Sequence, residues 1–135
     1  MTKADWFGFC YGLAFMLLCT EAHADNWIRF YESGRLARPG EIGKGPRDNY
    51  IPTNYYFVDA DSIRPEGALL RYRTREVLVD AEGATEHVAV FEMIADCEAK
   101  THAQLPSRDL VDTYEGTMSG DEVKAACSLA NQRSH

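Results

Sequence analysis

Residues 69–80 read LLRYRTREVLVD, and arginines at alternate positions are interleaved with mostly apolar or uncharged side chains in the first half of this stretch. A period of two residues with polar side chains interleaved is typical of an antiparallel strand that keeps one face in solvent. The stretch therefore predicts such a strand. Its two faces are Leu70, Tyr72, Thr74, Glu76 and Leu78 on one side, and Arg71, Arg73, Arg75, Val77 and Val79 on the other.

The next apolar stretch, HVAVFEMIADC at residues 87–97, predicts a second strand. Residues 80–85, DAEGAT, join the two stretches and read as a turn in which Gly83 can adopt a positive φ. The two strands are therefore expected to form a hairpin. Because both faces of the second strand are largely apolar, we expect it to lie in the centre of a sheet.

Two further strands are expected nearer the N-terminus, at residues 26–32 (NWIRFYE) and 55–59 (YYFVD). Residues 33–53 between them are rich in glycine and proline, which predicts a long loop. Near the C-terminus, Ser119 with Glu122 three positions later forms a capping-box pattern. Apolar residues then recur at helical spacing, which predicts a short C-terminal helix.

These elements predict an α+β fold, a small antiparallel β-sheet with a C-terminal α-helix. The chain has 135 residues and is 45% hydrophobic, which suits one domain and argues against disorder. Its net charge of −7 makes nucleic acid an unlikely partner. The expected organisation is a leader at residues 1–24 and a single domain at residues 25–135.

The leader prediction comes from residues 6–19, which are apolar and carry no charge, followed by Ala22-His23-Ala24. An apolar core before an A-x-A site is typical of a secretory signal peptide, and this core is shorter than the ~20 residues of a membrane span. We therefore expect cleavage near Ala24, no membrane span in the mature chain, and a periplasmic or cell-surface location. An uncleaved anchor and a buried N-terminal helix are the alternatives, and Leu18 disfavours lipidation at Cys19.

Cleavage would remove Cys10 and Cys19 and leave Cys97 and Cys127. Two cysteines of one small domain in an oxidising compartment are expected to pair, which would tie the helix to the sheet by one disulfide. The alternative is two free thiols. The absence of a C-x-x-C pattern argues against a zinc site and against redox catalysis.

No pattern in the sequence favours catalysis. The histidines His87, His102 and His135 have no metal-ligand spacing, and no serine lies in a G-x-S-x-G context. No glycine-rich segment joins a strand to a helix as a phosphate-binding loop would. We therefore expect no enzyme activity, no metal and no cofactor.

Six arginines are candidates for contact with an anionic partner. The alternative for each is a solvated face or loop, balanced on the strand by acidic neighbours such as Glu86 and Glu92. The candidates are Arg71, Arg73 and Arg75 on the strand, and Arg35, Arg38 and Arg47 in the loop.

Between Trp27 and Cys127 the chain resembles the surface-adhesin protein E family. The resemblance rests on the turn DADSI at residues 59–63, on Gly67, on Ala95-Asp96-Cys97 at a strand end, and on Cys127 in a C-terminal helix. It implies an exported bacterial domain, with some relatives acting as adhesins for host proteins. Two departures are Tyr72 where a tryptophan is expected and a compressed stretch between the cysteines.

The expected function is that of an exported binding or adhesin-like domain of the bacterial envelope, with a host or envelope protein as partner. An accessory or structural subunit of an envelope assembly is one alternative. A small periplasmic enzyme or inhibitor is another.

Overall fold

The computed structural model describes residues 26–41 and 49–134. The predicted signal peptide at residues 1–24 and the candidate Arg47 lie outside the described residues, as does His135.

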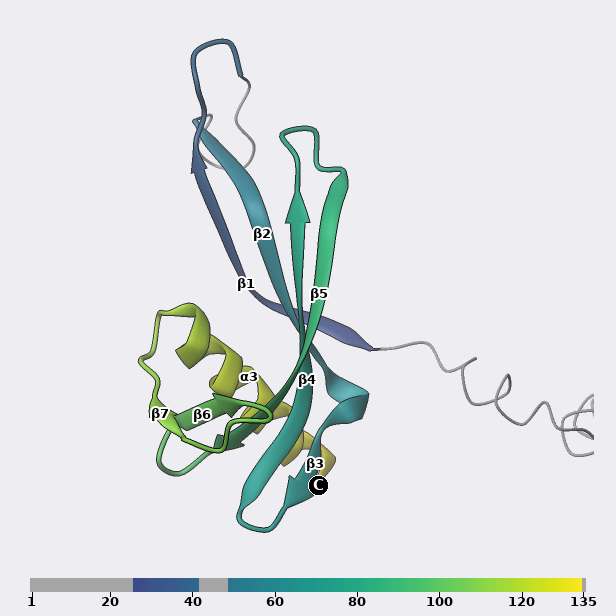
Figure 1. Ribbon diagram of the computed structural model, residues 1–135, viewed down its shortest axis with the longest axis vertical. Helices are drawn as coiled ribbons and strands as arrows, with labels where there is room; N and C mark the ends of the chain where they lie inside the picture. Colours follow the sequence, from purple (N-terminus) through teal and green to yellow (C-terminus); the bar gives the residue numbers. More distant parts are fainter. Residues whose placement is uncertain (1–25, 42–48, 135) are drawn as a thin grey trace, which may run out of the picture.

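The described chain forms one antiparallel sheet and one α-helix, which confirms the predicted fold class (Figure 1). The strands follow the order β1-β2-β4-β5-β6-β7, and β3 pairs with β4 at one end. The predicted hairpin is formed by β4 and β5. The elements are β1 (Trp27–Leu36), β2 (Tyr50–Asp59), the 3-10 turn η1 (Ala60–Ser62), β3 (Arg64–Glu66), β4 (Leu69–Val79), β5 (Thr85–Asp96), β6 (Thr101–Gln104), β7 (Val111–Asp112) and α3 (Met118–Arg133).

The sheet has two halves that differ in what surrounds them. We call the lower part of Figure 1 the braced half, because α3, β3 and β6 pack there against the long strands and β7 pairs with β6. We call the upper part the open half, where only the ends of two hairpins extend, at residues 31–36 with 50–56 and residues 76–79 with 85–91. The four long strands run through both halves.

The hydrophobic core lies in the braced half. Along β4 the predicted alternation is confirmed, because Tyr72 and Thr74 are buried on the side of α3 whereas the arginines point to the other side. The side chains in contact there come from the three strands β2, β4 and β5, from the turn region and from the helix. They are Val58, Ile63, Tyr72, Met93, Ala95, Val123 and Ala126.

The predicted disulfide is present and joins Cys97, just after β5, to Cys127 in α3, with an S–S distance of 2.05 Å. It closes the loop that contains β6 and β7. The bond therefore ties α3 covalently to the end of β5.

The loop predicted at residues 33–53 is shorter than expected, because β1 continues to Leu36 and β2 starts at Tyr50. Gly34 permits this pairing, since a Cβ there would lie 2.4 Å from the carbonyl oxygen of Ile51. Pro52 is tolerated because β2 pairs with β4 only from Asn54 onward. The glycine and proline content thus marks a close strand contact as well as a turn.

The predicted capping box at the helix is wrong. The N-cap is Thr117, whose side chain accepts a hydrogen bond from the amide of Gly120, and the helix is 16 residues long. Gly120 lies so close to the preceding segment that a Cβ would meet the carbonyl oxygen of Tyr114 at 1.9 Å. Glu122 does not cap the helix but is buried in the core.

The predicted central position of β5 is correct for only part of the strand. Residues 93–95 pair with β4 on one side and β6 on the other, and Asp96 pairs with β6. Residues 85–91 pair with β4 alone, so they form an edge within the described part of the sheet.

Candidate functional site

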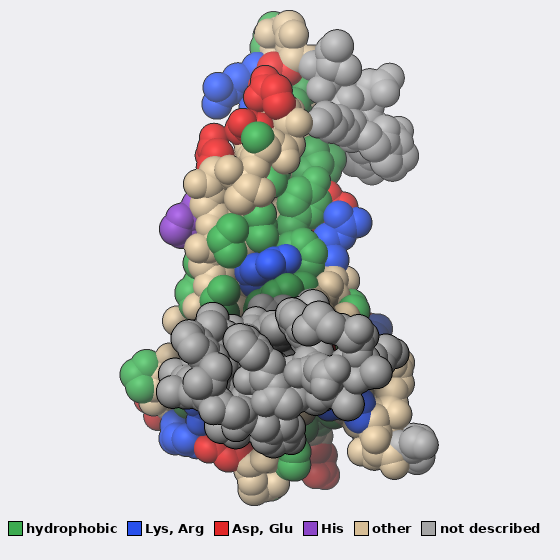
Figure 2. Space-filling view, turned by 90° about the vertical axis from the view of Figure 1, so that its right-hand side faces the viewer, with side chains coloured by type: hydrophobic (Ala, Val, Ile, Leu, Met, Phe, Trp, Pro, Cys, Tyr) green, Lys and Arg blue, Asp and Glu red, His purple; other side chains and the backbone are tan. Residues whose placement is uncertain are grey.

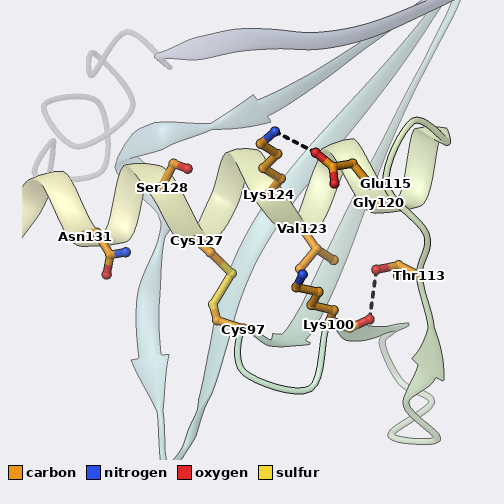
Figure 3. A pocket seen from close by; sticks show the side chains of 10 residues that line it. All are labelled: Cys97, Lys100, Thr113, Glu115, Gly120, Val123, Lys124, Cys127, Ser128 and Asn131. Carbon is orange, nitrogen blue, oxygen red and sulfur yellow. Dashed lines mark hydrogen bonds and ion pairs between the residues drawn. A yellow bond between two sulfur atoms is a disulfide. The ribbon is translucent and has the colours of Figure 1, made fainter.

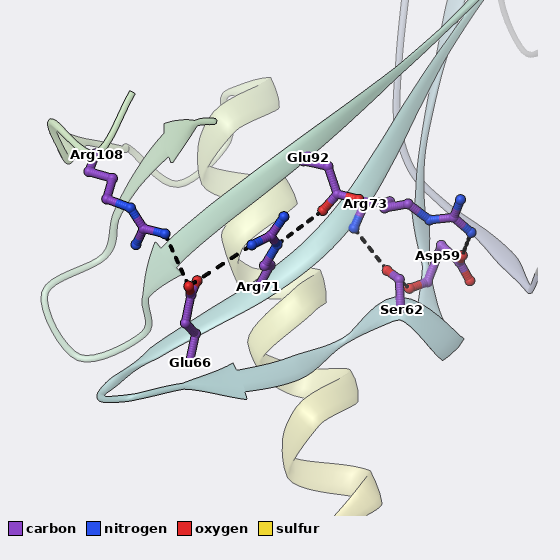
Figure 4. Close-up of polar contacts among 7 residues, drawn as sticks. All are labelled: Asp59, Ser62, Glu66, Arg71, Arg73, Glu92 and Arg108. Atoms are coloured by element: carbon purple, nitrogen blue, oxygen red, sulfur yellow. Dashed lines mark hydrogen bonds and ion pairs between the residues drawn. The ribbon is translucent and has the colours of Figure 1, made fainter. Parts of the chain in front are cut away.

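Arg71, the first arginine of the predicted stripe, has a structural role. It forms ion pairs with Glu92 on β5, at 3.4 Å, and with Glu66 on β3, at 4.0 Å (Figure 4). Arg108 also reaches Glu66, at 3.0 Å. These contacts connect β3, β4 and β5 to the segment after β6, and they confirm that Glu92 balances the stripe.

Arg73 is also held by neighbours. Its guanidinium donates to the buried carboxylate of Asp59, at 2.5 Å, and its backbone amide donates to the hydroxyl of Ser62 (Figure 4). Asp59 in turn accepts from the amide of Asp61 as the cap of η1. The side chains of Arg71 and Arg73 are 31% and 35% exposed, so these two members of the predicted stripe are less exposed than expected.

Arg75 differs from these two arginines. Its guanidinium carbon lies 4.7 Å from the ring centre of Trp27 and 4.8 Å from that of Phe57. Its Nε is buried and has no hydrogen-bond partner among the described residues. Of the three arginines on β4, Arg75 is therefore the one whose guanidinium has no carboxylate partner among the described residues and lies against aromatic rings.

Strand register gathers further residues around Arg75. Phe57 lies opposite both Arg75 on β4 and Arg29 on β1, and Arg29 stacks over the ring of Tyr55 at 5.2 Å. We call this set, on the face of the sheet away from α3, the aromatic–arginine cluster. It comprises Trp27, Arg29, Tyr55, Phe57 and Arg75.

The same face continues into the open half as an apolar surface. Arg75 lies opposite Val90 and Val77 opposite Val88, and Val88 and Val90 are 46% and 52% exposed. Figure 2 shows hydrophobic side chains along the upper part of this face, with basic side chains among them and beside them. No described helix or strand covers this surface.

The loop arginines do not join the cluster. Arg35 makes two hydrogen bonds of 2.8 Å with the carboxylate of Glu41, which also accepts from the amide of Arg38. These bonds from Arg35 and then Arg38 lower the pKa of Glu41 to about 2. Arg35 is thus engaged at the tip of the open half, far along the strand from Arg75.

A buried polar group lies beneath α3. The carboxylate of Glu122 accepts from the hydroxyl of Tyr72, at 2.6 Å, and lies 2.8 Å from Nδ1 of His102. Burial, followed by the charge of Glu122, raises the pKa of Tyr72 far above its usual value. Both contacts are made to Oε2 of Glu122, so one carboxylate oxygen of α3 joins β4 to β6, and the arrangement agrees with a structural His102.

A cavity of about 260 Å³ lies between α3 and the segment around β6 and β7 (Figure 3). The disulfide forms part of its wall, and Lys100 and Lys124 flank it. Lys124 is paired with Glu115 at 3.1 Å. The lining contains no histidine and no pair of carboxylates, and no cluster of three metal-ligating side chains occurs at residues 26–41 and 49–134.

No protein family, curated protein or solved structure matches the chain. The resemblance to the surface-adhesin protein E family thus stays a prediction. Among the described helices, none is both long and apolar enough to cross a membrane.

The aromatic members of the cluster were not predicted as site residues. Trp27 and Arg29 are two residues apart, which places them on one face of a strand, but the sequence does not tell which residues of other strands lie beside them. The signal that could have found them is the alternation of Tyr55 and Phe57 on one strand and of Trp27 and Arg29 on another, beside alternate arginines on a third.

Proposed function

We propose that the chain is an exported, non-enzymatic binding domain that contacts an acidic protein through the aromatic–arginine cluster. The observation that carries the proposal is Arg75, stacked between Trp27 and Phe57 with a buried Nε that has no partner in the described part of the chain.

The chemistry of the cluster suits a carboxylate-bearing protein surface. A guanidinium stacked on rings loses little conformational freedom when its planar edge donates two bonds to a carboxylate. Tryptophan, tyrosine and arginine are the side chains most often responsible for binding energy at protein interfaces. In a chain of net charge −7, a local basic cluster also orients an acidic partner toward this face.

The apolar leader and the disulfide support export, because disulfides persist in oxidising compartments. The resemblance to the surface-adhesin protein E family supports an adhesin-like role. The partner proposed is therefore a host or envelope protein with exposed aspartate or glutamate side chains.

The test uses immobilised protein to capture binders from a panel of purified extracellular-matrix and serum proteins and from envelope extract. The dissociation constant of each captured protein is then measured for the wild type and for Arg75→Glu. Reversing a charge in the contact is expected to weaken binding about thirtyfold or more. Trp27→Ala, which removes the ring under Arg75, is expected to act in the same direction.

Arg64→Glu is the matched control, because Arg64 is an exposed arginine on β3 in the braced half. It makes the same change in net charge and should leave the dissociation constant within about twofold. Equal losses for Arg75→Glu and Arg64→Glu would mean that only net charge matters. Either that result or an unchanged constant for Arg75→Glu would reject the cluster as the binding site.

Export is tested separately by sequencing the N-terminus of the protein recovered from the cell envelope. The expected first residue is Asp25, directly after the Ala22-His23-Ala24 pattern. A chain that begins at Met1 or at a lipidated Cys19 would contradict the proposed processing.

A further inference from the structure

Lys100 adopts a backbone conformation that lysine rarely has. Its φ is 56°, in the left-handed region, and it is the one residue other than glycine with a positive φ within residues 26–41 and 49–134. A side chain in this region brings its Cβ close to the backbone, so glycine or asparagine usually fills such positions. Lys100 is the last residue of the turn at residues 97–100 between β5 and β6. A lysine is therefore strained at a position that favours glycine.

The segment after β7 holds the turn in this conformation. The amide and the hydroxyl of Thr113 both donate to the carbonyl oxygen of Lys100, at 3.0 Å and 2.8 Å. With its backbone fixed there, Lys100 directs its side chain into the cavity beside α3, toward Val123 (Figure 3). Its Nζ makes no ion pair or hydrogen bond with the described part of the chain. Backbone strain that aims an unpaired polar group into a cavity is a common feature of binding sites.

The charged side chains of the cavity leave one positive charge uncompensated. They are Lys100, Lys124 and Glu115, and Lys124 is paired with Glu115 at 3.1 Å. The hydrogen bond from Lys124, then the charges of Lys124 and Lys100, lower the pKa of Glu115, so its carboxylate is ionised at neutral pH. One negative charge on a ligand therefore balances the cavity. A second negative charge would lie near the carboxylate of Glu115 and be repelled.

The rest of the lining suits a short hydrocarbon group. Val123 contributes an aliphatic side chain, and the disulfide between Cys97 and Cys127 forms part of the wall. Aliphatic carbon and polarisable sulfur both make favourable contacts with hydrocarbon. The cavity volume of about 260 Å³ lies below the ~300–1,000 Å³ of sites for drug-sized ligands, so a smaller molecule fits.

From these features we propose that the cavity binds a small organic monocarboxylate. The carboxylate pairs with Nζ of Lys100, and the hydrocarbon part lies against Val123 and the disulfide. Such a charge-assisted bond is stronger than a bond between neutral groups. The cavity lies beside α3, whereas the aromatic–arginine cluster lies on the other face of the sheet, so the inference does not depend on the proposed function.

The test is a titration of the isotope-labelled protein with hexanoate, followed through the amide signals in two-dimensional NMR spectra. Saturable shifts are expected at the residues of the cavity, with a dissociation constant on the order of 1 mM for a ligand of this size. Hexanamide lacks the charge, adipate adds a second charge and acetate lacks the hydrocarbon chain, so each should bind at least about tenfold more weakly. Equal binding of any of these three, or no saturable shift up to about 20 mM hexanoate, would overturn the inference.

Lys100→Gly separates binding from folding. Because it removes the ammonium group, the dissociation constant for hexanoate should rise about tenfold or more. Because glycine suits a positive φ, the unfolding temperature should rise by about 2–4 °C. A variant that binds hexanoate as tightly as the wild type would contradict the proposal. A fall in the unfolding temperature would also contradict it, since Lys100 would then occupy this position to support the fold.

Lys100→Gln removes the charge but keeps most of the side chain and the strained backbone, so it should weaken binding as much as Lys100→Gly does. Arg64→Gln is the matched control, because it removes one positive charge from an exposed position on β3. It should leave the dissociation constant for hexanoate within about twofold. Equal losses in Lys100→Gln and Arg64→Gln would show that only net charge matters, and the cavity site would be rejected.

Arg75 offers a second place for a carboxylate, so the position of the shifts decides between two sites. Hexanoate at the aromatic–arginine cluster would shift the amide signals of β2 and β4, and Arg75→Glu would abolish these shifts. Shifts confined to the cluster would overturn the cavity site. Arg75→Glu should leave the titration of the cavity unchanged, so failure of the proposed function and failure of this inference are separable.

Discussion

In the braced half of the molecule, β4 places Tyr72 against α3, where its hydroxyl bonds to Glu122 and its ring is fully buried. In the open half, the neighbouring strand ends carry Val88 and Val90 with about half of each side chain in solvent. The same four strands build both halves (Figure 1). The difference lies in the layer above them, because α3 covers one half and no described element covers the other.

The residues that stabilise the fold and the residues that remain available for contact therefore lie in different parts of this small domain. The disulfide, the core cluster and the Glu122 group all lie in the braced half, and they supply the stability of the fold. The aromatic–arginine cluster and the outer edge of β5 lie at or beyond the border of this half, where half-buried rings and exposed valines remain available for contact. Substitutions in the two halves should therefore have different consequences.

The largest loss of stability is expected from removal of the disulfide. The bond between Cys97 and Cys127 closes a loop with a sequence separation of 30 residues, which corresponds to about 3.5–4 kcal/mol of unfolded-chain entropy. A Cys97→Ser, Cys127→Ser double variant should lose about this free energy of unfolding in a urea titration. A loss below about 1 kcal/mol would show that the braced half does not depend on its covalent link.

The next largest effect is expected at the buried carboxylate. Glu122→Ala leaves the hydroxyl of Tyr72 and Nδ1 of His102 without their partner, which should cost about 2–3 kcal/mol. Glu98→Ala, at an exposed position after β5, should change the free energy of unfolding by less than about 0.5 kcal/mol. Equal effects of the two substitutions would argue against the Glu122 group as a main support of α3.

A pH dependence should follow from Tyr72. Its pKa is raised in the folded state, first by burial, so its contribution to stability is complete below the unfolded value of about 10. As the pH rises above that value, the unfolded chain releases the proton while the folded chain keeps it. Stability should therefore fall by up to about 1.4 kcal/mol per pH unit from this group.

Thermal denaturation between pH 8 and pH 11 measures this slope. Tyr72→Phe has no hydroxyl to ionise and should show a shallower decline than the wild type. Tyr50 and Tyr56, whose pKa values are also raised mainly by burial, supply the decline that remains. Identical slopes for the wild type and Tyr72→Phe would contradict the assignment.

The smallest effect on the free energy of unfolding is expected in the aromatic–arginine cluster. Arg75→Ala removes the stacking on Trp27 and Phe57 and should cost no more than about 1 kcal/mol. The same variant should lose partner binding in the capture experiment. A loss of stability as large as that of Glu122→Ala would mean that Arg75 supports the fold, and the comparison between the two halves would fail.

Several features were predictable from the sequence for local reasons. The alternation in residues 69–80 depends only on the two-residue period of a strand, and β4 confirms it. The β4–β5 hairpin follows from a turn between adjacent strands, and the disulfide follows from two cysteines in one domain.

The features that were not predicted depend on contacts between distant residues. Glu122 matched a local capping pattern, yet its partners Tyr72 and His102 lie on other strands. The glycines and prolines of residues 33–53 suggested a loop, yet Gly34 fits against Ile51 in a strand pair. The cluster around Arg75 likewise needs three strands in register, which no single segment of the sequence specifies.

The alternation along β4 also bears on how this protein can change over evolutionary time. Alternate positions of β4 are under different structural constraints, because Tyr72 and Thr74 must fit the core whereas Arg75 and Val77 face outward. A lineage that meets a new partner can thus alter every second residue of the strand without repacking the interior. Divergence among descendants should accumulate at the outward positions while the inward ones stay nearly fixed.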